Sequence, residues 1–246
     1  MEFQKIKLHR SEKRGSAVTQ ITLDDDYNVP DYRQDIVKVI KEHGELRFDE
    51  VKAMEGAAWI KGSLIFKVLY RSDKQEGKIS CLRGEIPFQE RLNMDGLSEY
   101  DAVHAVGDIE DLTVGVINSR KLNIRAVIVL TASADTEVDE ELTCELSDGS
   151  DYEQNIVEKE ALKLLVVRRD ICRQKSEAVL PSSKPNIREI LWQSMQLRNV
   201  ESRLTEGNIR FSGEILVSIL YNDEEEGEHL SWYETTVPLD AQAECG

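Results

Sequence analysis

The side chains that most often perform catalysis or bind metal are scattered along this sequence. They comprise the histidines His9, His43, His104 and His229 and the cysteines Cys81, Cys144, Cys172 and Cys245. No two of them have the spacing of a zinc site, a redox pair or a nucleophile with its base. The 47 acidic residues offer many chance carboxylate pairs for a glycosidase, and only geometry distinguishes such a pair. We predict no catalytic residue, no metal site and no cofactor, and therefore no enzyme.

The most basic short stretch of the chain holds Arg120, Lys121 and Arg125. These side chains are candidate partner-binding residues, because they could engage an acidic surface on another protein. The structural alternative is that they pair with nearby acids such as Asp108 and Glu110, or protect an exposed strand edge. We favour the structural alternative.

The overall charge limits the classes of partner. With 31 Lys and Arg against 47 Asp and Glu, the 246 residues carry a formal charge of -16, which disfavours nucleic acid and anionic membrane surfaces. The first residues lack the apolar core of a signal peptide, and no apolar stretch is long enough to span a bilayer. Widely spaced cysteines are typical of a reducing compartment. We predict a globular cytoplasmic protein of one or two domains that does not insert into a membrane.

Part of the sequence occurs twice. A shift of 151 residues aligns residues 30–70 with residues 181–221 without a gap, and ten positions are then identical. They include Pro30/Pro181, Gly56/Gly207, Gly62/Gly213 and Tyr70/Tyr221. We interpret this as an internal repeat and predict a complete first unit over residues 1–146 and an incomplete second unit over residues 152–246.

Each copy begins with a pattern typical of a short helix. Ile36, Val39, Ile40 and His43 recur at helical spacing before Gly44, which places His43 on the inner, packed face. Alternation then predicts strands, with Ile60, Gly62, Leu64, Phe66, Val68 and Tyr70 on one face and a turn at Glu55–Gly56. The expected fold class is α+β and β-dominated: two homologous antiparallel-sheet units, each with a short helix.

The second copy lacks counterparts of two further β-runs, Val103–Ile117 and Leu122–Ala132. If these runs extend the sheet of the first unit, the second unit has an open strand edge that favours strand addition. We therefore predict a homo-oligomer, strand exchange with a partner, or a longer chain that supplies the missing strand.

The combined motifs resemble the SPOCS domain. The resemblance rests on the proline before the first element, the spacing of Gly56 and Gly62, the run that ends at Tyr70, the acidic tip after it, and Ile86-Pro87-Phe88. The stretch INSRKLNIRA at residues 117–126 resembles a signature of the same family. The match extends over nearly the whole chain in two successive units.

The resemblance implies a protein of sporulating Firmicutes, similar to the SipL-like proteins that assemble the spore envelope in the mother cell, at the spore surface and coat. In those proteins a lysin-motif domain follows the SPOCS units and docks on a morphogenetic ATPase; no such domain follows Gly246 here. The expected function is a non-catalytic structural and interaction role, with envelope proteins, the ATPase among them, as expected partners. The alternative is a glycan- or peptidoglycan-binding β-module that stacks sugars on Trp59, Trp192, Trp232 or Tyr233, although a core role is favoured for these residues.

Overall fold

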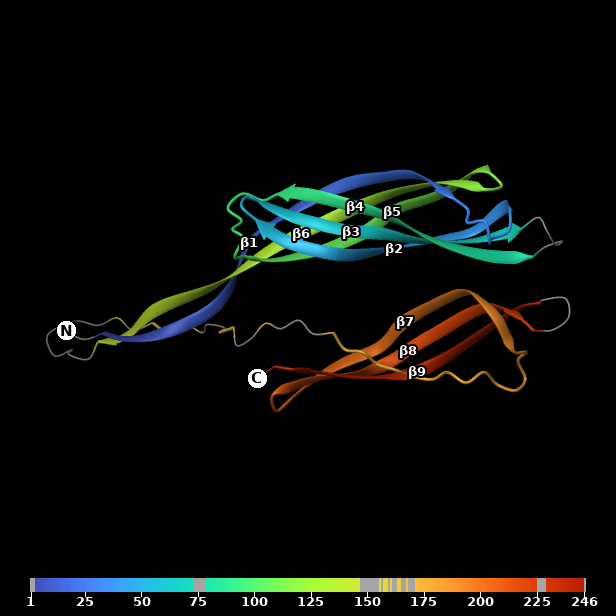
Figure 1. Cartoon of the computed structure of the whole chain (residues 1–246). Coiled ribbons are helices and arrows are strands. Elements are labelled where there is room, and N and C mark those ends of the chain that lie inside the picture. The colour runs from blue at the N-terminus through green and yellow to red at the C-terminus, as the bar shows by residue number, and fades with distance from the viewer. Residues whose placement is uncertain are drawn as a thin grey trace.

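The computed structural model describes residues 3–72, 78–146, 171–224 and 229–245, with residues 155, 157, 158, 160, 163, 164 and 167 between them. Within these residues the chain forms three antiparallel sheets of three strands each and no helix (Figure 1). The strands are β1 (Phe3–Asn28), β2 (Ile36–Met54), β3 (Ala57–Ser72), β4 (Ile79–Asn93), β5 (Ala102–Asn118), β6 (Lys121–Leu146), β7 (Ile187–Thr205), β8 (Asn208–Asp223) and β9 (Leu230–Glu244). The prediction of a β-dominated fold is confirmed.

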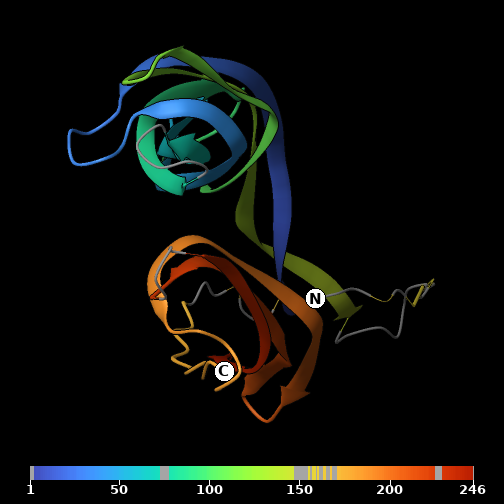
Figure 2. The ribbon, with the colours of Figure 1, turned by 90° about the vertical axis from the view of Figure 1, so that its right-hand side faces the viewer.

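Two of the sheets enclose one hydrophobic core. The sheet β2-β3-β4 and the sheet β1-β6-β5 curve around each other, with β5 beside β2 and β1 beside β4 (Figure 2). The core is contributed mainly by their central strands, β3 and β6. Its fully buried members include Ile60, Leu64, Phe66 and Val68 of β3 and Leu122, Ile124, Ile128 and Leu130 of β6. In both strands these residues alternate with residues of the opposite face, as the pleat of a strand requires.

The predicted short helix is wrong, because Ile36 to Gly44 form the first half of β2. The register between β2 and β3 shifts at Ile36/Lys38 and again at Val39/Lys41. Each β-bulge adds one residue to its strand, so Ile36 and Val39 both face inward although they are three residues apart. Two successive bulges therefore reproduce the apolar spacing of a helix. His43 is correspondingly exposed on the strand surface rather than packed.

The arrangement of the first unit also differs from the expected single sheet. The prediction that the runs now seen as β5 and β6 extend the sheet of β2, β3 and β4 is wrong, because both belong to the opposite sheet. Their third partner is β1, which sequence analysis did not predict and which pairs with β6 from Phe3↔Leu146 to Asn28↔Lys121. The outer halves of β1 and β6 extend beyond the core as a two-stranded ribbon (Figure 1).

The third sheet, β7-β8-β9, has the strand order of β2-β3-β4 at an offset of 151 residues. The pair Leu64↔Ile86 corresponds to Ile215↔Val237, and the first two register shifts of β2 recur in β7 at Ile187/Glu189 and Ile190/Trp192. The turn glycines correspond as well, with φ of 70° at Gly56 and 72° at Gly207. Glycine adopts this left-handed conformation without a steric cost. The predicted boundary between the units, near residues 147–151, lies outside the described residues.

Both units fix the loop before their first long strand in the same way. The Tyr70 hydroxyl donates to the Gln34 carbonyl at 3.1 Å, and the Tyr221 hydroxyl donates to the Pro185 carbonyl at 3.2 Å. Both tyrosines are fully buried, and burial raises the pKa of Tyr70. A buried phenol needs a hydrogen-bond partner for its hydroxyl, and in each unit one loop carbonyl is that partner.

Candidate interaction surface

Arg120 lies in the turn between β5 and β6 and binds the loop that precedes β2. Its guanidinium donates to the carbonyls of Val29, Pro30 and Arg33 at 3.0, 2.9 and 2.7 Å. It also lies 3.2 Å from a carboxylate oxygen of Asp35. The planar array of five N–H donors in arginine suits several acceptors at once. Arg120 therefore attaches the tip of the β5–β6 hairpin to the facing sheet.

The other two basic candidates are placed differently. Lys121 forms an ion pair of 2.7 Å with Asp26 of β1. Hydrogen bonds from Lys121 and from Asn123 hold the pKa of Asp26 below its ordinary value of 3.8. Arg125 is exposed on β6. The acids that pair with this basic stretch are thus Asp26 and those of the loop before β2, rather than the acids of β5. A partner-binding role for the three basic residues stays a prediction.

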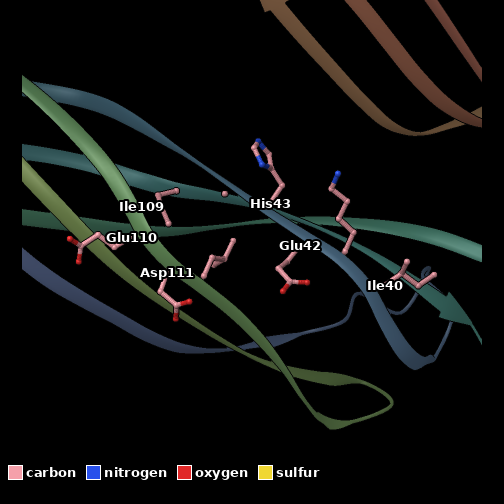
Figure 3. Close-up of a pocket in the computed structure, with 9 residues that line it drawn as sticks. Ile40, Glu42, His43, Ile109, Glu110 and Asp111 are labelled. Carbon is pink, nitrogen blue, oxygen red and sulfur yellow. The ribbon is translucent and has the colours of Figure 1, made fainter.

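A hollow of about 550 Å³ lies between β2 and β5, where the two strands run side by side (Figure 3). Its rim holds His43, Glu42, Glu110 and Asp111, a set that could in principle perform acid–base chemistry. The side chains do not converge: the imidazole points away from the carboxylates of Glu42 and Asp111 (Figure 3). Instead, His43 Nε2 lies 3.3 Å from Glu45 Oε1. Within the described part of the chain, no group of three His, Cys, Asp or Glu is arranged to hold a metal ion.

The aromatic candidates for sugar stacking are not gathered on one surface. Trp59 is half-buried in β3, and Trp232 of β9 is 62% exposed with the Lys184 ammonium 5.2 Å from its ring centre. Tyr233 is half-buried and donates to the Val179 carbonyl at 3.2 Å. Trp192 of β7 lies in the contact between the two units, where the Lys41 ammonium is 5.2 Å from its ring centre. Trp232 is therefore the most accessible of the four.

The two units touch through a few side chains of β2, β4 and β7. Arg33 donates to Glu189 at 3.0 Å across this contact, and a cavity of about 240 Å³ lies beside Trp192. Cys81 lines the same cavity, and burial raises the pKa of its thiol. A thiol with a raised pKa is a poor nucleophile, so this cavity offers no activated cysteine.

Among the described residues, no second sheet covers the apolar face of the sheet β7-β8-β9. Leu46 of β2 packs against the core of the first unit, whereas its counterpart Leu197 is 65% exposed. Ala53 also packs against that core, whereas its counterpart Leu204 is 79% exposed. Large apolar side chains gathered on one exposed surface typically mark a site of protein interaction. We name the face of β7-β8-β9 that corresponds to the core face of β2-β3-β4 the open face.

One neighbour of the open face does have a counterpart in the first unit. Residues 171–180 run beside β9, as β1 runs beside β4. The Gln174 side chain bonds to the Pro238 carbonyl and to the Asp240 N–H, yet residues 171–180 belong to no strand. The second unit thus contains equivalents of β2 to β4 and an extended segment in the place of β1, and its described residues contain no equivalent of β5 or β6. The sequence predicts an open edge here; the signal for a whole open face is the apolar alternation in residues 209–219.

Comparison with known proteins identifies part of the first unit. Residues 35–117 match the family model described as SipL, SPOCS domain. This segment is a SPOCS domain. The SPOCS domain covers β2 to β5 almost to the residue, so the expected family is confirmed for this part of the chain. Searches of curated proteins and of solved structures found no match. No helix in the described residues is long and apolar enough to cross a membrane.

Proposed function

We propose that this protein is a non-catalytic assembly component of the bacterial spore envelope that acts through protein–protein contacts. The observation that carries the proposal is the SPOCS domain at residues 35–117, whose family description names SipL. The expected place of action is the mother-cell side of the developing spore. The expected partners are other envelope proteins, with a morphogenetic ATPase as one candidate.

The structure supports an interaction role through the open face. A chain that encloses a well-packed core in its first unit leaves equivalent apolar positions of its second unit exposed, among them Leu197 and Leu204. Exposing such side chains to water is unfavourable by about 1.5–3 kcal/mol each relative to full burial. Binding of a partner over this face would recover that free energy, which favours assembly over isolation.

Deletion of the gene in its sporulating host tests the proposal. Electron microscopy of the spores is expected to show an envelope that is missing, detached or misassembled, and the unmodified gene should restore it. A fluorescent fusion of the full chain is expected to form a ring around the forespore. Normal envelopes together with the loss of a metabolic activity would contradict the proposal and favour an enzyme.

The alternative is a glycan-binding β-module, and the observation that favours it is the exposed ring of Trp232. Sugar rings stack on accessible aromatic faces, so purified peptidoglycan would retain the protein on this interpretation. Retention that is lost in Trp232→Ala but kept in Trp59→Ala would support glycan binding. We expect no retention of either variant or of the unmodified chain.

A further inference from the structure

We propose that the cavity beside Trp192, between the two units, binds a small phosphate monoester, with the phosphate against Lys67 and Arg83 and the organic part against the indole. The proposal goes beyond the assembly role and does not depend on it. Three observations carry it: the charge of the cavity wall, the incomplete pairing of two cations, and the different residues at the same place on the second unit.

The cavity is basic in a chain that is strongly acidic. Among the described residues that line it, Arg33, Lys67 and Arg83 are cationic and Glu189 alone is acidic, whereas the whole chain carries a formal charge of -16. Arg33 is paired with Glu189 at 3.0 Å, which leaves Lys67 and Arg83. Burial raises the pKa of the Cys81 thiol in the same wall, and the charges of Arg33 and Lys67 oppose this rise. The wall therefore attracts an anion.

Lys67 of β3 and Arg83 of β4 lie directly opposite each other in the sheet, on the face that points away from the core. Like charges in opposite positions destabilise a sheet. The Lys67 side chain is only 15% exposed, and its ammonium is 3.7 Å from Glu45, too far for a hydrogen bond. Arg83 forms no ion pair with any carboxylate of the described residues. An anion between the two cations would remove their repulsion.

The second unit shows that the fold does not require these cations. At the offset of 151 residues, the pair Lys67↔Arg83 becomes Ser218↔Glu234. There the Ser218 hydroxyl donates to the Glu234 carboxylate at 2.8 Å, so each side chain satisfies the other. The cationic pair is thus particular to the first unit, where it lines the cavity against the second unit.

The two cations favour a phosphate over a carboxylate. The planar donors of an arginine and the compact charge of a lysine both suit phosphate oxygens. A phosphate monoester carries a charge of about -1.5 to -2 at pH 7, which matches the two cations together. A single carboxylate would neutralise only one of them.

The rest of the wall is apolar and limits the size of the ligand. Leu82 and Leu191 are buried there, and the indole of Trp192 lines the cavity beside them. Drug-sized ligands occupy cavities of about 300–1,000 Å³, often between domains. A volume of about 240 Å³ therefore takes a smaller molecule. We expect one small ring or short chain next to the phosphate, packed on the indole.

Equilibrium dialysis of the full chain against phenyl phosphate, in about 0.15 M salt, tests the proposal. One molecule should bind per chain, with a dissociation constant below about 1 mM. Inorganic phosphate should bind at least about tenfold more weakly, because it lacks the apolar ring. Benzoate should also bind at least about tenfold more weakly, because it forms fewer charged hydrogen bonds.

Matched substitutions locate the bound phosphate. Lys67→Gln and Arg83→Gln should each weaken the binding of phenyl phosphate by at least about tenfold, because each removes a charged donor. Arg83 is exposed, so its variant tests the site even if Lys67→Gln does not fold. The control Lys61→Gln removes one charge from an exposed position of β3 outside the cavity and should change the affinity less than about twofold. Trp192→Leu should weaken the binding of phenyl phosphate more than that of inorganic phosphate.

Each other result would overturn the proposal. No saturable binding of phenyl phosphate would show that the cavity is only a gap in the contact between the units. Equal weakening by Arg83→Gln and Lys61→Gln would indicate general electrostatic attraction rather than a site. Equal affinity for benzoate would contradict the assignment to a phosphate, and equal affinity for inorganic phosphate would contradict the role of Trp192. The spore phenotype of the gene deletion is independent of all these results, so the assembly role is tested separately.

Discussion

The sheets β2-β3-β4 and β7-β8-β9 have the same strand order, nearly the same register and the same turn glycines, yet one is buried and the other is open. The shared features are determined within each sheet, by alternation, bulges and turns between strands that are close in sequence. The difference comes from β6. This strand belongs to the opposite sheet and packs its inward side chains on the sheet β2-β3-β4. In this protein, the strand order and register of a sheet therefore do not determine whether its apolar face is buried.

The comparison also shows what each part contributes to stability. A sheet with one apolar face must bury that face against another element, and two sheets with a shared core form a stable domain. The first unit meets this condition through β1, β5 and β6. The second unit does not meet it within its described residues, so its stability is expected to depend on a partner.

The largest expected effect comes from matched core substitutions. Leu64→Ala removes a fully buried side chain and should lower the free energy of opening of the first unit by about 3 kcal/mol. The matched control Ile215→Ala affects a half-buried side chain and should cost about 1 kcal/mol in the second unit. Native-state hydrogen exchange measures β3 and β8 separately. Equal losses would show that the open face is covered in solution.

A smaller effect is expected for the tip of the β5–β6 hairpin. Arg120→Ala removes the donor to three loop carbonyls and should destabilise the first unit by about 2 kcal/mol, because charged hydrogen bonds to partly buried acceptors are lost. The control Arg125→Ala changes an exposed side chain and should lie within about 0.5 kcal/mol of the unmodified protein. Urea denaturation measures both. A larger loss for the control would reassign the main structural role to Arg125.

The turn glycines should respond alike in the two units. Ala at Gly56 or Gly207 must adopt a φ near 70°, which costs about 1 kcal/mol for a residue with a Cβ. Apart from the adjacent residues of the chain, no atom lies within 4 Å of the added Cβ at either position, so the cost is conformational alone. Hydrogen exchange at β2–β3 and at β7–β8 should therefore show similar losses in the free energy of opening. A loss confined to one unit would show that the two turns are not energetically equivalent, although their registers correspond.

The sequence predicted the strands better than the sheets. Alternation identified the inward face of Ile60 to Tyr70, and the repeat identified the turn at Gly56. The helix before them was wrong because bulges at Val37 and Ile40 imitate helical spacing, and a bulge depends on the partner strand as much as on its own residues. β1 was missed because its outer half is polar and its pairing partner lies at the other end of the first unit.

The interaction surface was predicted only in outline. The given sequence repeats β2 to β4 at an offset of 151 residues, but which face of the repeated sheet is buried depends on where β5 and β6 lie in the first unit. Arg120 was recognised as part of a signature, while its acceptors on the loop at Val29 to Arg33 required the structure. Every residue has a backbone carbonyl, so the sequence does not mark which carbonyls accept hydrogen bonds. From the sequence alone, an arginine that binds such carbonyls cannot be distinguished from one that binds another protein.

The smallest expected effect concerns acid. Hydrogen bonds from Ser63 and from Arg47 hold the pKa of Glu85 in the first unit below its ordinary value of 4.5, and a hydrogen bond from Arg210 does the same for Asp240 in the second unit, below 3.8. A lowered folded-state pKa stabilises the protein above the unfolded-state value, and this contribution is lost as the pH falls through the folded-state value. Glu85→Gln should therefore reduce the loss of stability of the first unit below about pH 4.5, and Asp240→Asn that of the second unit below about pH 3.8.

Both carboxylates are exposed, so water and salt screen these pairs and the changes in urea midpoint should be small. Each pair can be isolated by a double-mutant cycle with Arg47→Ala or Arg210→Ala, in which the coupling should vanish once the carboxylate is protonated. The two couplings should be similar, because the pairs lie on the solvent side of their sheets, where cover of the inner face has no influence. Clearly unequal couplings would contradict this independence and would mean that the register of β8 and β9 depends on what covers the inner face of the sheet.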